Sequence, residues 1–200
     1  MKISVIVGHP YEKSFNVAIA GTVVDQLRND RHTVYYHNLY EEKFNPIVTE
    51  GELAAGKPDD ELAKQHCGQI AAADGIVIIH PNWWGQPPAI MKGWVDRILY
   101  NGLAFRFAES DSGGGVPVGL LRAKKGIVFN TSNTEERRER EVFGDPLERI
   151  WKDCIFKFCG VHDVTRKVFS IVADSTEQER NKWLAEVRNC IHESFPAEKS

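Results

Sequence analysis

Two adjacent tryptophans, Trp83 and Trp84, mark the stretch of this sequence where chemistry is most expected. They follow Ile76–Ile79, a continuous β-branched run that is typical of a central strand covered on both faces. Gly85 and the Pro87–Pro88 pair bound the turn, because proline blocks both further strand pairing and an earlier helix start. In an open parallel sheet, ligands bind beyond the carboxyl ends of the strands. The paired indoles therefore predict a binding place for a flat ligand.

A second candidate binding element lies near the start of the chain. Lys2–Val7 is predicted to be a strand, Gly8-His9-Pro10 breaks it, and apolar residues with helical spacing begin after Ser14. The free N–H groups and positive dipole end of such a helix favour a phosphate, and Ser14 adds a hydroxyl. Neither GxGxxG nor GxxxxGK[ST] is present, which argues against a nicotinamide-type Rossmann site and a triphosphate-binding loop. A phosphate-bearing cofactor held by a serine-containing loop is left open.

Length and composition restrict the class of protein. The 200 residues suffice for a single domain over residues 1–200, in which one core buries roughly 70% of the unfolded surface. A formal net charge of −3 offers no electrostatic footprint for nucleic acid or an anionic membrane. No apolar run approaches the ~20 residues of a membrane span and Met1 leads directly into the first strand, so we expect a cytoplasmic protein. The cysteines lack metal-ligand spacing, and we expect buried free thiols and no metal site at Cys67, Cys154, Cys159 and Cys190.

Strands and helices alternate along the rest of the chain. Three further strands are predicted: Thr33–Asn38, which is polar like an edge strand, Lys125–Asn130 and Val164–Val172. Four further helices are predicted: Asp59–Ala73, one that follows Pro88, one that Asp145 caps with Pro146 at its first position, and one whose Ser175 forms a capping box with Gln178. Leu39–Pro58 shows no clear periodicity.

Five strands that alternate with helices predict an α/β doubly wound parallel sheet with helices on both faces. We choose the strand order 2-1-3-4-5, which places the edge-like second strand outside. The carboxyl ends of strands one, three and four would then surround one crevice, where three segments converge: His9–Asn16, Pro81–Gln86 and Asn130–Asn133.

Two features keep alternative interpretations. Phe105 and Phe107 alternate, so their rings share one side of an extended backbone and either pack under a loop or face a ligand or second subunit. The charge run Glu135–Glu141 is more simply a solvated loop or helical face than a substrate-recognition element.

The helix after Asp145 is expected to pack through a stripe of Leu147, Ile150, Trp151, Cys154, Ile155 and Phe158.

Short motifs along nearly the whole chain share their order and spacing with one family. They are Gly8-His9-Pro10 with Ser14-Phe15-Asn16, Asn38-Leu39-Tyr40, Phe44-Asn45-Pro46, His80-Pro81, Pro88 to Trp94, Gly102, Phe105 and Phe158-Cys159-Gly160. The sequence resembles the flavodoxin-like NAD(P)H:quinone oxidoreductases, the DT-diaphorase group with its bacterial relatives. The resemblance implies a flavodoxin-like fold and a homodimer with a flavin at each subunit interface. It also implies hydride transfer from NADH or NADPH to the flavin, followed by two-electron reduction of a quinone.

The resemblance also implies roles for individual residues. Ser14, Phe15 and Asn16 would hold the flavin phosphates, with His9 beside them. The ring would be lined by Pro81, Asn82, Trp83, Trp84 and Gly85, and its polar edge would be hydrogen-bonded by Asn130, Thr131, Ser132 and Asn133. Arg180 resembles the arginine near the adenosine half of FAD, which favours FAD over the alternative, FMN. Substrate contacts are expected from Phe105 and Phe107, which would reach over the partner's flavin, and from Trp84.

The sequence also departs from the family pattern. DT-diaphorase carries a tyrosine and a histidine near the reducible edge of the flavin, and about Arg137 and Phe143 stand in their places here. No catalytic side chain is therefore assigned. Flavin reactivity can persist, because the cofactor performs the hydride chemistry while the protein orients it. The alternative function is a flavin-binding regulatory subunit of a potassium efflux system, since such ancillary proteins resemble the same family.

Overall fold

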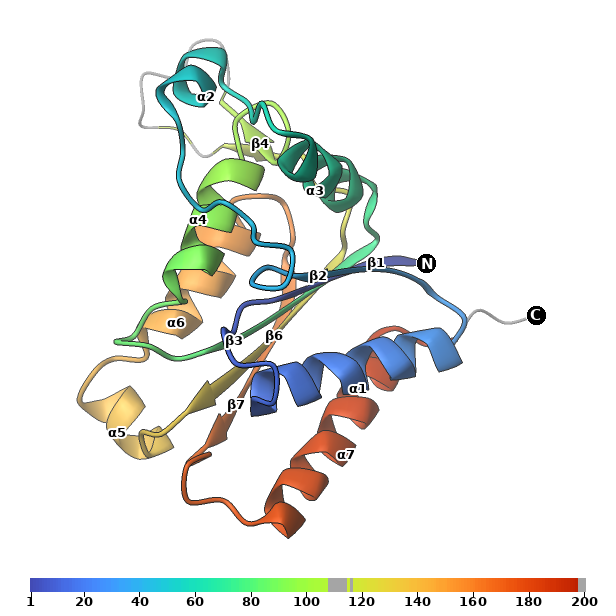
Figure 1. Ribbon diagram of the computed structural model, residues 1–200, viewed down its shortest axis with the longest axis vertical. Coiled ribbons are helices and arrows are strands. Elements are labelled where there is room, and N and C mark those ends of the chain that lie inside the picture. The colour runs from blue at the N-terminus through green and yellow to red at the C-terminus, as the bar shows by residue number, and fades with distance from the viewer. Residues whose placement is uncertain (108–114, 116, 198–200) are drawn as a thin grey trace.

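A parallel five-stranded sheet forms the centre of the computed structural model, which describes residues 1–107, 115 and 117–197. The order across the sheet is β2-β1-β3-β6-β7 (Figure 1). The strands are β1 Lys2–Val7, β2 Thr33–Asn38, β3 Gly75–Pro81, β6 Lys125–Ser132 and β7 Asp163–Ser170. Counted along the chain, these are the five strands expected, so the predicted order 2-1-3-4-5 is confirmed.

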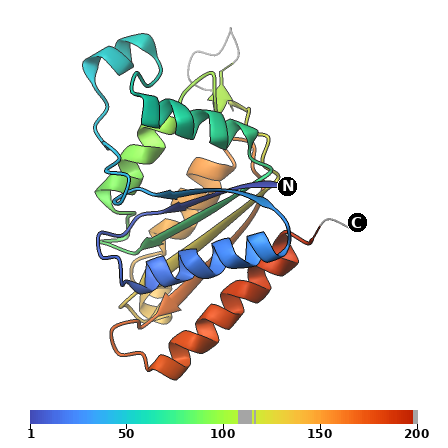
Figure 2. The same cartoon turned by 45° about the vertical axis from the view of Figure 1, so that its right-hand side comes forward.

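Helices cover both faces of this sheet (Figures 1 and 2). One face carries α1 Phe15–Asn29 and α7 Glu177–Ser194, and the other carries α3 Glu61–Ala72, α4 Ala89–Ile98 and the continuous segment α6 Pro146–Arg149 with the π-helix η1 Ile150–Phe156. The buried strand β3 serves both layers, because successive side chains point to opposite faces. Ile76 and Ile78 pack with the α3, α4 and η1 side, whereas Val77 and Ile79 pack with α1 and α7.

The segment at the end of α7 completes the core on the α1 side of the sheet, at the amino-terminal ends of the strands. Phe195, which follows α7, is buried, and its ring lies so close to Gly75 that a Cβ at Gly75 would overlap it. The carbonyl oxygen of Phe195 lies 2.9 Å from Nε2 of the buried His32. A residue from the end of the chain is therefore built into the amino-terminal end of the sheet.

The π-helix changes the predicted core stripe. In a π-helix the hydrogen bond spans five residues, so the buried position after Trp151 is Phe156. Cys154, which we expected to be buried, is exposed, and Cys159 is buried one turn later. All four cysteines are free thiols, and Cys67, Cys159 and Cys190 are buried as expected.

Three helix starts differ from the predictions. The helix α3 begins at Glu61 after the cap Asp60, two residues later than the predicted start at Asp59. Thr176 with Glu179 forms the capping box of α7 in place of Ser175 with Gln178. Asp145 has a left-handed backbone and makes no capping hydrogen bond, so the predicted cap is wrong, although Pro146 is the first residue of α6. A short helix, α2 Glu50–Ala55, interrupts the stretch without clear periodicity.

A small two-stranded sheet was not predicted. It pairs β4 Phe105–Arg106 with β5 Val118–Gly119 in antiparallel fashion, and Gly119 touches the backbone of Gly160 so closely that a Cβ there would overlap it. The charge run forms the helix α5 Glu136–Glu141. In the part of the chain that the structure describes, no helix has both the length and the apolar character needed to cross a bilayer.

Candidate active site

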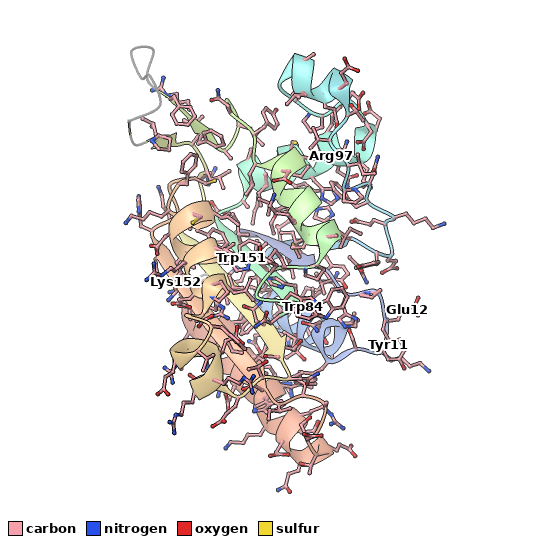
Figure 3. All side chains as sticks on the ribbon, turned by 90° about the vertical axis from the view of Figure 1, so that its left-hand side faces the viewer. Tyr11, Glu12, Trp84, Arg97, Trp151 and Lys152 are labelled. Carbon is pink, nitrogen blue, oxygen red and sulfur yellow. The ribbon has the colours of Figure 1, made fainter. Side chains whose placement is uncertain are left out.

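The three segments expected to converge do so at the carboxyl ends of β1, β3 and β6. They surround a cleft of about 410 Å³ whose walls are His9, Tyr11, Ser14, Phe15, Asn16, Pro81, Asn82, Trp83, Thr131, Ser132, Asn133, Thr134, Val172 and Ala173. Figure 3 views this end of the sheet, with Tyr11 and Trp84 labelled. Ten of the fourteen cofactor-binding residues predicted from the sequence thus line one cavity.

One wall of this cleft is the amino terminus of α1. Ser14 caps the helix, because its hydroxyl oxygen accepts a hydrogen bond from the Val17 amide at 3.3 Å. The amides of Phe15 and Asn16 precede the first bond of the helix and stay available to an anion. Burial lowers the pKa of His9, and the hydrogen bond that its Nδ1 accepts from the Tyr11 amide offsets this only in part.

Asn16 carries a polar atom that no described protein group satisfies. Its Nδ2 donates to Thr131 Oγ1 at 2.9 Å, whereas its Oδ1 is buried and has no hydrogen-bond partner. Buried polar atoms in folded proteins are rarely left without a partner, so this oxygen points to a ligand or to water. The free amides at the start of α1 and this acceptor oxygen therefore fit a cofactor that carries a phosphate and hydroxyl groups.

The aromatic turn, residues 83–86, forms a second wall. Trp83 and Gln86 exchange two backbone hydrogen bonds at 3.0 and 3.1 Å, and the two residues between them have positive φ, 57° for Trp84 and 70° for Gly85. This is the pattern of a type I′ turn. The Trp83 ring centroid lies 6.0 Å from that of His9, and Trp84 is fully exposed.

A second cavity, of about 520 Å³, lies on the other side of the turn. Its walls are Asn82, Trp84, Gly85, Thr134, Glu139, Phe143 and Pro146. Asn82 and Thr134 line both cavities, so the two are adjacent. The aromatic turn contributes Trp83 to the first cavity and Trp84 with Gly85 to the second.

Glu139 was missed by the sequence analysis, which took the whole charge run as solvated. Only 6% of Glu139 is exposed, and its Oε1 accepts a hydrogen bond from Asn82 Nδ2 at 2.9 Å. The other pairs on α5, Arg137 with Glu141 and Arg140 with Glu136, are exposed ion pairs at i, i+4. The available signal was the spacing, since Glu139 has no basic residue four positions away.

Beneath the site lies a buried polar network centred on His80. Its Nε2 accepts from Trp151 Nε1 at 2.8 Å and from Asn130 Nδ2 at 3.1 Å, so the proton of the neutral ring is on Nδ1, which donates to the Pro81 carbonyl at 2.7 Å. Burial lowers the pKa of His80 to about 4 and keeps the ring neutral. Asn130, predicted to contact the cofactor, lies in this network and does not line either cavity.

The network continues into an ion-paired group behind α5. Arg166 Nε donates to Asn130 Oδ1 at 2.6 Å, and its Nη1 lies 2.8 Å from Asp145 and 3.2 Å from Glu148. The side chain of Arg166 is buried. These contacts tie the end of β6 to the loop that carries Asp145 and so fix the floor of the site.

Three other predicted contacts lie outside both cavities. Arg180 donates to the Ser175 carbonyl and hydroxyl within the first turn of α7. Phe105 and Phe107 form an edge-to-face cluster with Phe158, with ring centroids 4.7 to 6.1 Å apart. Phe105 is half-buried in this cluster, as packing under a loop predicts. Phe107 is exposed on the cluster, as contact with a ligand or second subunit would require. In one chain, neither phenylalanine reaches the aromatic turn.

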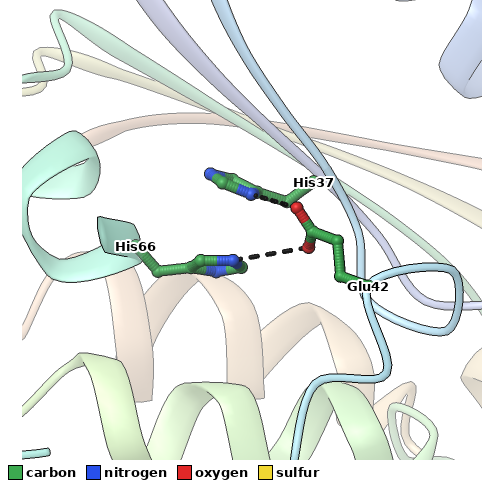
Figure 4. Close-up of side chains that lie close together, drawn as sticks. All are labelled: His37, Glu42 and His66. Atoms are coloured by element: carbon green, nitrogen blue, oxygen red, sulfur yellow. Dashed lines mark hydrogen bonds and ion pairs between the residues drawn. The ribbon is translucent and has the colours of Figure 1, made fainter. Parts of the chain in front are cut away.

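A separate cluster of His37, Glu42 and His66 has the composition of a metal site (Figure 4). Trp94 Nε1 donates to His66 Nδ1 at 2.9 Å, which places the proton of the neutral ring on Nε2, the atom that faces Glu42. A protonated nitrogen cannot bind a metal ion. Burial alone would raise the pKa of Glu42, but its interactions with the two histidines outweigh burial and lower the pKa to about 2. The cluster is therefore a closed polar contact between β2 and α3.

The chain is similar to known proteins in both sequence and fold. A family profile described as a flavodoxin-like fold matches residues 1–191. The chain is 32% identical to an uncharacterised NAD(P)H oxidoreductase of Haemophilus influenzae over 82% of this chain and 81% of that protein. It is 27% identical to mouse ribosyldihydronicotinamide dehydrogenase [quinone], over 92% and 87% of the two chains. An FMN-dependent NADH-azoreductase of Bacillus anthracis, solved with FMN, shares the fold with a TM-score of 0.72 at 16% identity, over 96% of this chain and 99% of that one.

Proposed function

The chain belongs to the flavodoxin-like fold family, and we propose that it is a flavin-dependent NAD(P)H oxidoreductase that reduces a quinone or a similar flat acceptor. One observation carries the proposal. A helix start suited to phosphate and an exposed aromatic turn line two adjacent cavities of about 410 and 520 Å³. The names of the oxidoreductase relatives support this activity, and they give the regulatory alternative from the potassium efflux systems second place.

The residues of the cleft have distinct tasks in this proposal. The amides of Phe15 and Asn16 bind the phosphate, and the unpartnered Asn16 Oδ1 accepts a hydroxyl donor. Pro81 and Trp83 in the cleft and Trp84 in the adjacent cavity present flat apolar surface to the ring, and hydroxyls and amides of residues 131–134 face its polar edge. When bound, the flavin supplies the hydride chemistry, and the protein orients it and tunes its electronics.

No side chain of the described chain is assigned as a proton donor. The Tyr and His of the family pattern are absent, and burial keeps His9 and His80 in their neutral forms near pH 7. The site then works by binding and orientation. Donor and acceptor would use the same flavin face in turn, which predicts ping-pong kinetics.

The choice of flavin rests on Arg180, which favours FAD with FMN as the alternative. Arg180 donates to the Ser175 carbonyl and hydroxyl outside both cavities, so the preference for FAD rests on the family resemblance. A homodimer is also part of the proposal. Exposed Trp84, Phe107 and Phe143 would gain cover from a second subunit, as expected for aromatics at a subunit interface.

Reconstitution tests the activity directly. The purified chain is incubated with FAD or FMN, freed of excess flavin, and assayed with NADH and NADPH against a panel of quinones, nitroaromatics and azo dyes. We expect flavin-dependent oxidation of the nicotinamide with parallel lines in double-reciprocal plots. Flavin retention without turnover of any acceptor would refute the enzyme and favour the regulatory alternative.

A further inference from the structure

Trp84 occupies a backbone conformation that an L-residue rarely adopts. Its φ of 57° is left-handed, which costs a non-glycine residue free energy that must be recovered elsewhere. The side chain is fully exposed, so packing within the described chain does not recover it. Other contacts must therefore hold the aromatic turn in place.

Besides the two backbone hydrogen bonds between Trp83 and Gln86, the side chain of Asn82 provides such a contact. Its side-chain Oδ1 accepts a hydrogen bond from the Gly85 backbone amide at 2.9 Å. Its backbone N–H donates to the Thr131 carbonyl at 2.7 Å. The first bond restrains the residue after Trp84, and the second fixes Asn82 to the end of β6. The conformation of the turn thus depends on which way the Asn82 side chain is oriented.

Glu139 determines that orientation. An ionised carboxylate only accepts hydrogen bonds, so its Oε1 pairs with Asn82 Nδ2 and leaves Oδ1 toward Gly85. Reversal of the Asn82 amide would place an oxygen against the carboxylate and an NH₂ group against the Gly85 N–H. Pro146, just beyond the same loop, supports the turn from that side, since a Cβ on Gly85 would come within 2.7 Å of its Cγ.

We infer that Glu139 is the positioning residue of the aromatic turn and, through Asn82, of its affinity for the flat cofactor. Glu139 comes from α5, 57 positions along the chain from Asn82, and only 6% of it is exposed. The inference rests on the proposed function for the identity of the ligand. The hydrogen-bond relay itself is independent of any ligand.

The test compares Glu139→Ala with Glu139→Gln, which keeps an acceptor oxygen, and with Glu141→Ala as the matched control. Glu141 lies on the same helix, and among the described residues it pairs only with the exposed Arg137. The first measurement is the rate of hydrogen exchange at the Gly85 backbone amide, detected by NMR in the flavin-free protein. We expect exchange on the order of tenfold faster in Glu139→Ala, and near the wild-type rate in the other two variants.

The second measurement is the Kd for FMN and FAD by fluorescence titration, with thermal midpoints as the check on folding. We expect binding on the order of tenfold weaker in Glu139→Ala alone. Unchanged Gly85 exchange in that variant would overturn the inference, and so would faster exchange at wild-type flavin affinity. A wild-type chain that binds neither flavin refutes the proposed function instead, and the exchange data then decide alone whether Glu139 holds the turn.

Discussion

Replacing Trp84 or Trp151 by alanine should separate ligand binding from stability, because the two indoles have opposite environments. Trp151 is completely buried and donates to His80 Nε2, so truncation leaves a cavity and removes a hydrogen bond (Figure 3). Such changes cost about 3–5 kcal/mol. For a chain of this size, each kcal/mol lowers the thermal midpoint by roughly 2–4 °C, so we expect a decrease of roughly 6–20 °C.

Trp84 is fully exposed, and its loss should change the free energy of unfolding by no more than about 0.5 kcal/mol. Its removal should instead weaken flavin binding, because it takes away aromatic surface at the proposed site. Thermal midpoints of the flavin-free variants and flavin content after gel filtration give both quantities. Equal flavin loss in the two variants at unchanged midpoints would refute the assignment of the aromatic turn as the cofactor site.

Three further predictions concern other parts of the molecule. The pKa of Glu42 is lowered to about 2, so its contribution to stability is present above its unfolded-state pKa and is lost as the pH falls toward 2. Glu42→Gln should therefore flatten the dependence of stability on pH below about pH 5, measured by circular dichroism in acid titrations. An unchanged slope would contradict this. Gly119→Ala should lower the thermal midpoint, because the added methyl group overlaps the backbone of Gly160; a wild-type midpoint would show that the contact can open freely. Arg180→Ala should weaken FAD binding by at least ~1 kcal/mol in titration calorimetry and leave FMN binding unchanged, and equal effects on both flavins would refute its role.

The sheet was predictable because its signal is local. The β-branched run in β3 and the apolar positions in β1 specify buried strands, and alternation with helices restricts the order in which they pair. The π-helix was not predictable in the same way. An α-helical stripe predicts Cys154 as the buried position after Trp151, whereas the π-helix buries Phe156, whose ring packs on Gly126 of β6. The capping box of α7 was displaced by one residue, since neighbouring side chains can accept the same hydrogen bonds.

The site was predictable where it depends on strand ends and was missed where it depends on tertiary contacts. His9, Asn16 and Trp83 meet because parallel strands end on one edge of the sheet, which the sequence implies. Glu139 and Asn130 are different cases, since a buried carboxylate and a buried amide are recognised only by the partners that the fold brings to them. Sequence patterns describe neighbours along the chain, and these partners lie 36 to 57 residues away.

The burial of Phe195 against Gly75 also bears on how the protein is made. On the ribosome, β1 and α1 emerge long before α7, and until then one face of the sheet keeps Ile3 and its neighbours open to water. Such a nascent intermediate is a substrate for chaperones and is prone to associate with other chains. Completion of the α1 layer must wait until synthesis has passed Phe195. Folding of this layer therefore depends on α7 and Phe195, and chains truncated before α7 should be degraded or aggregate.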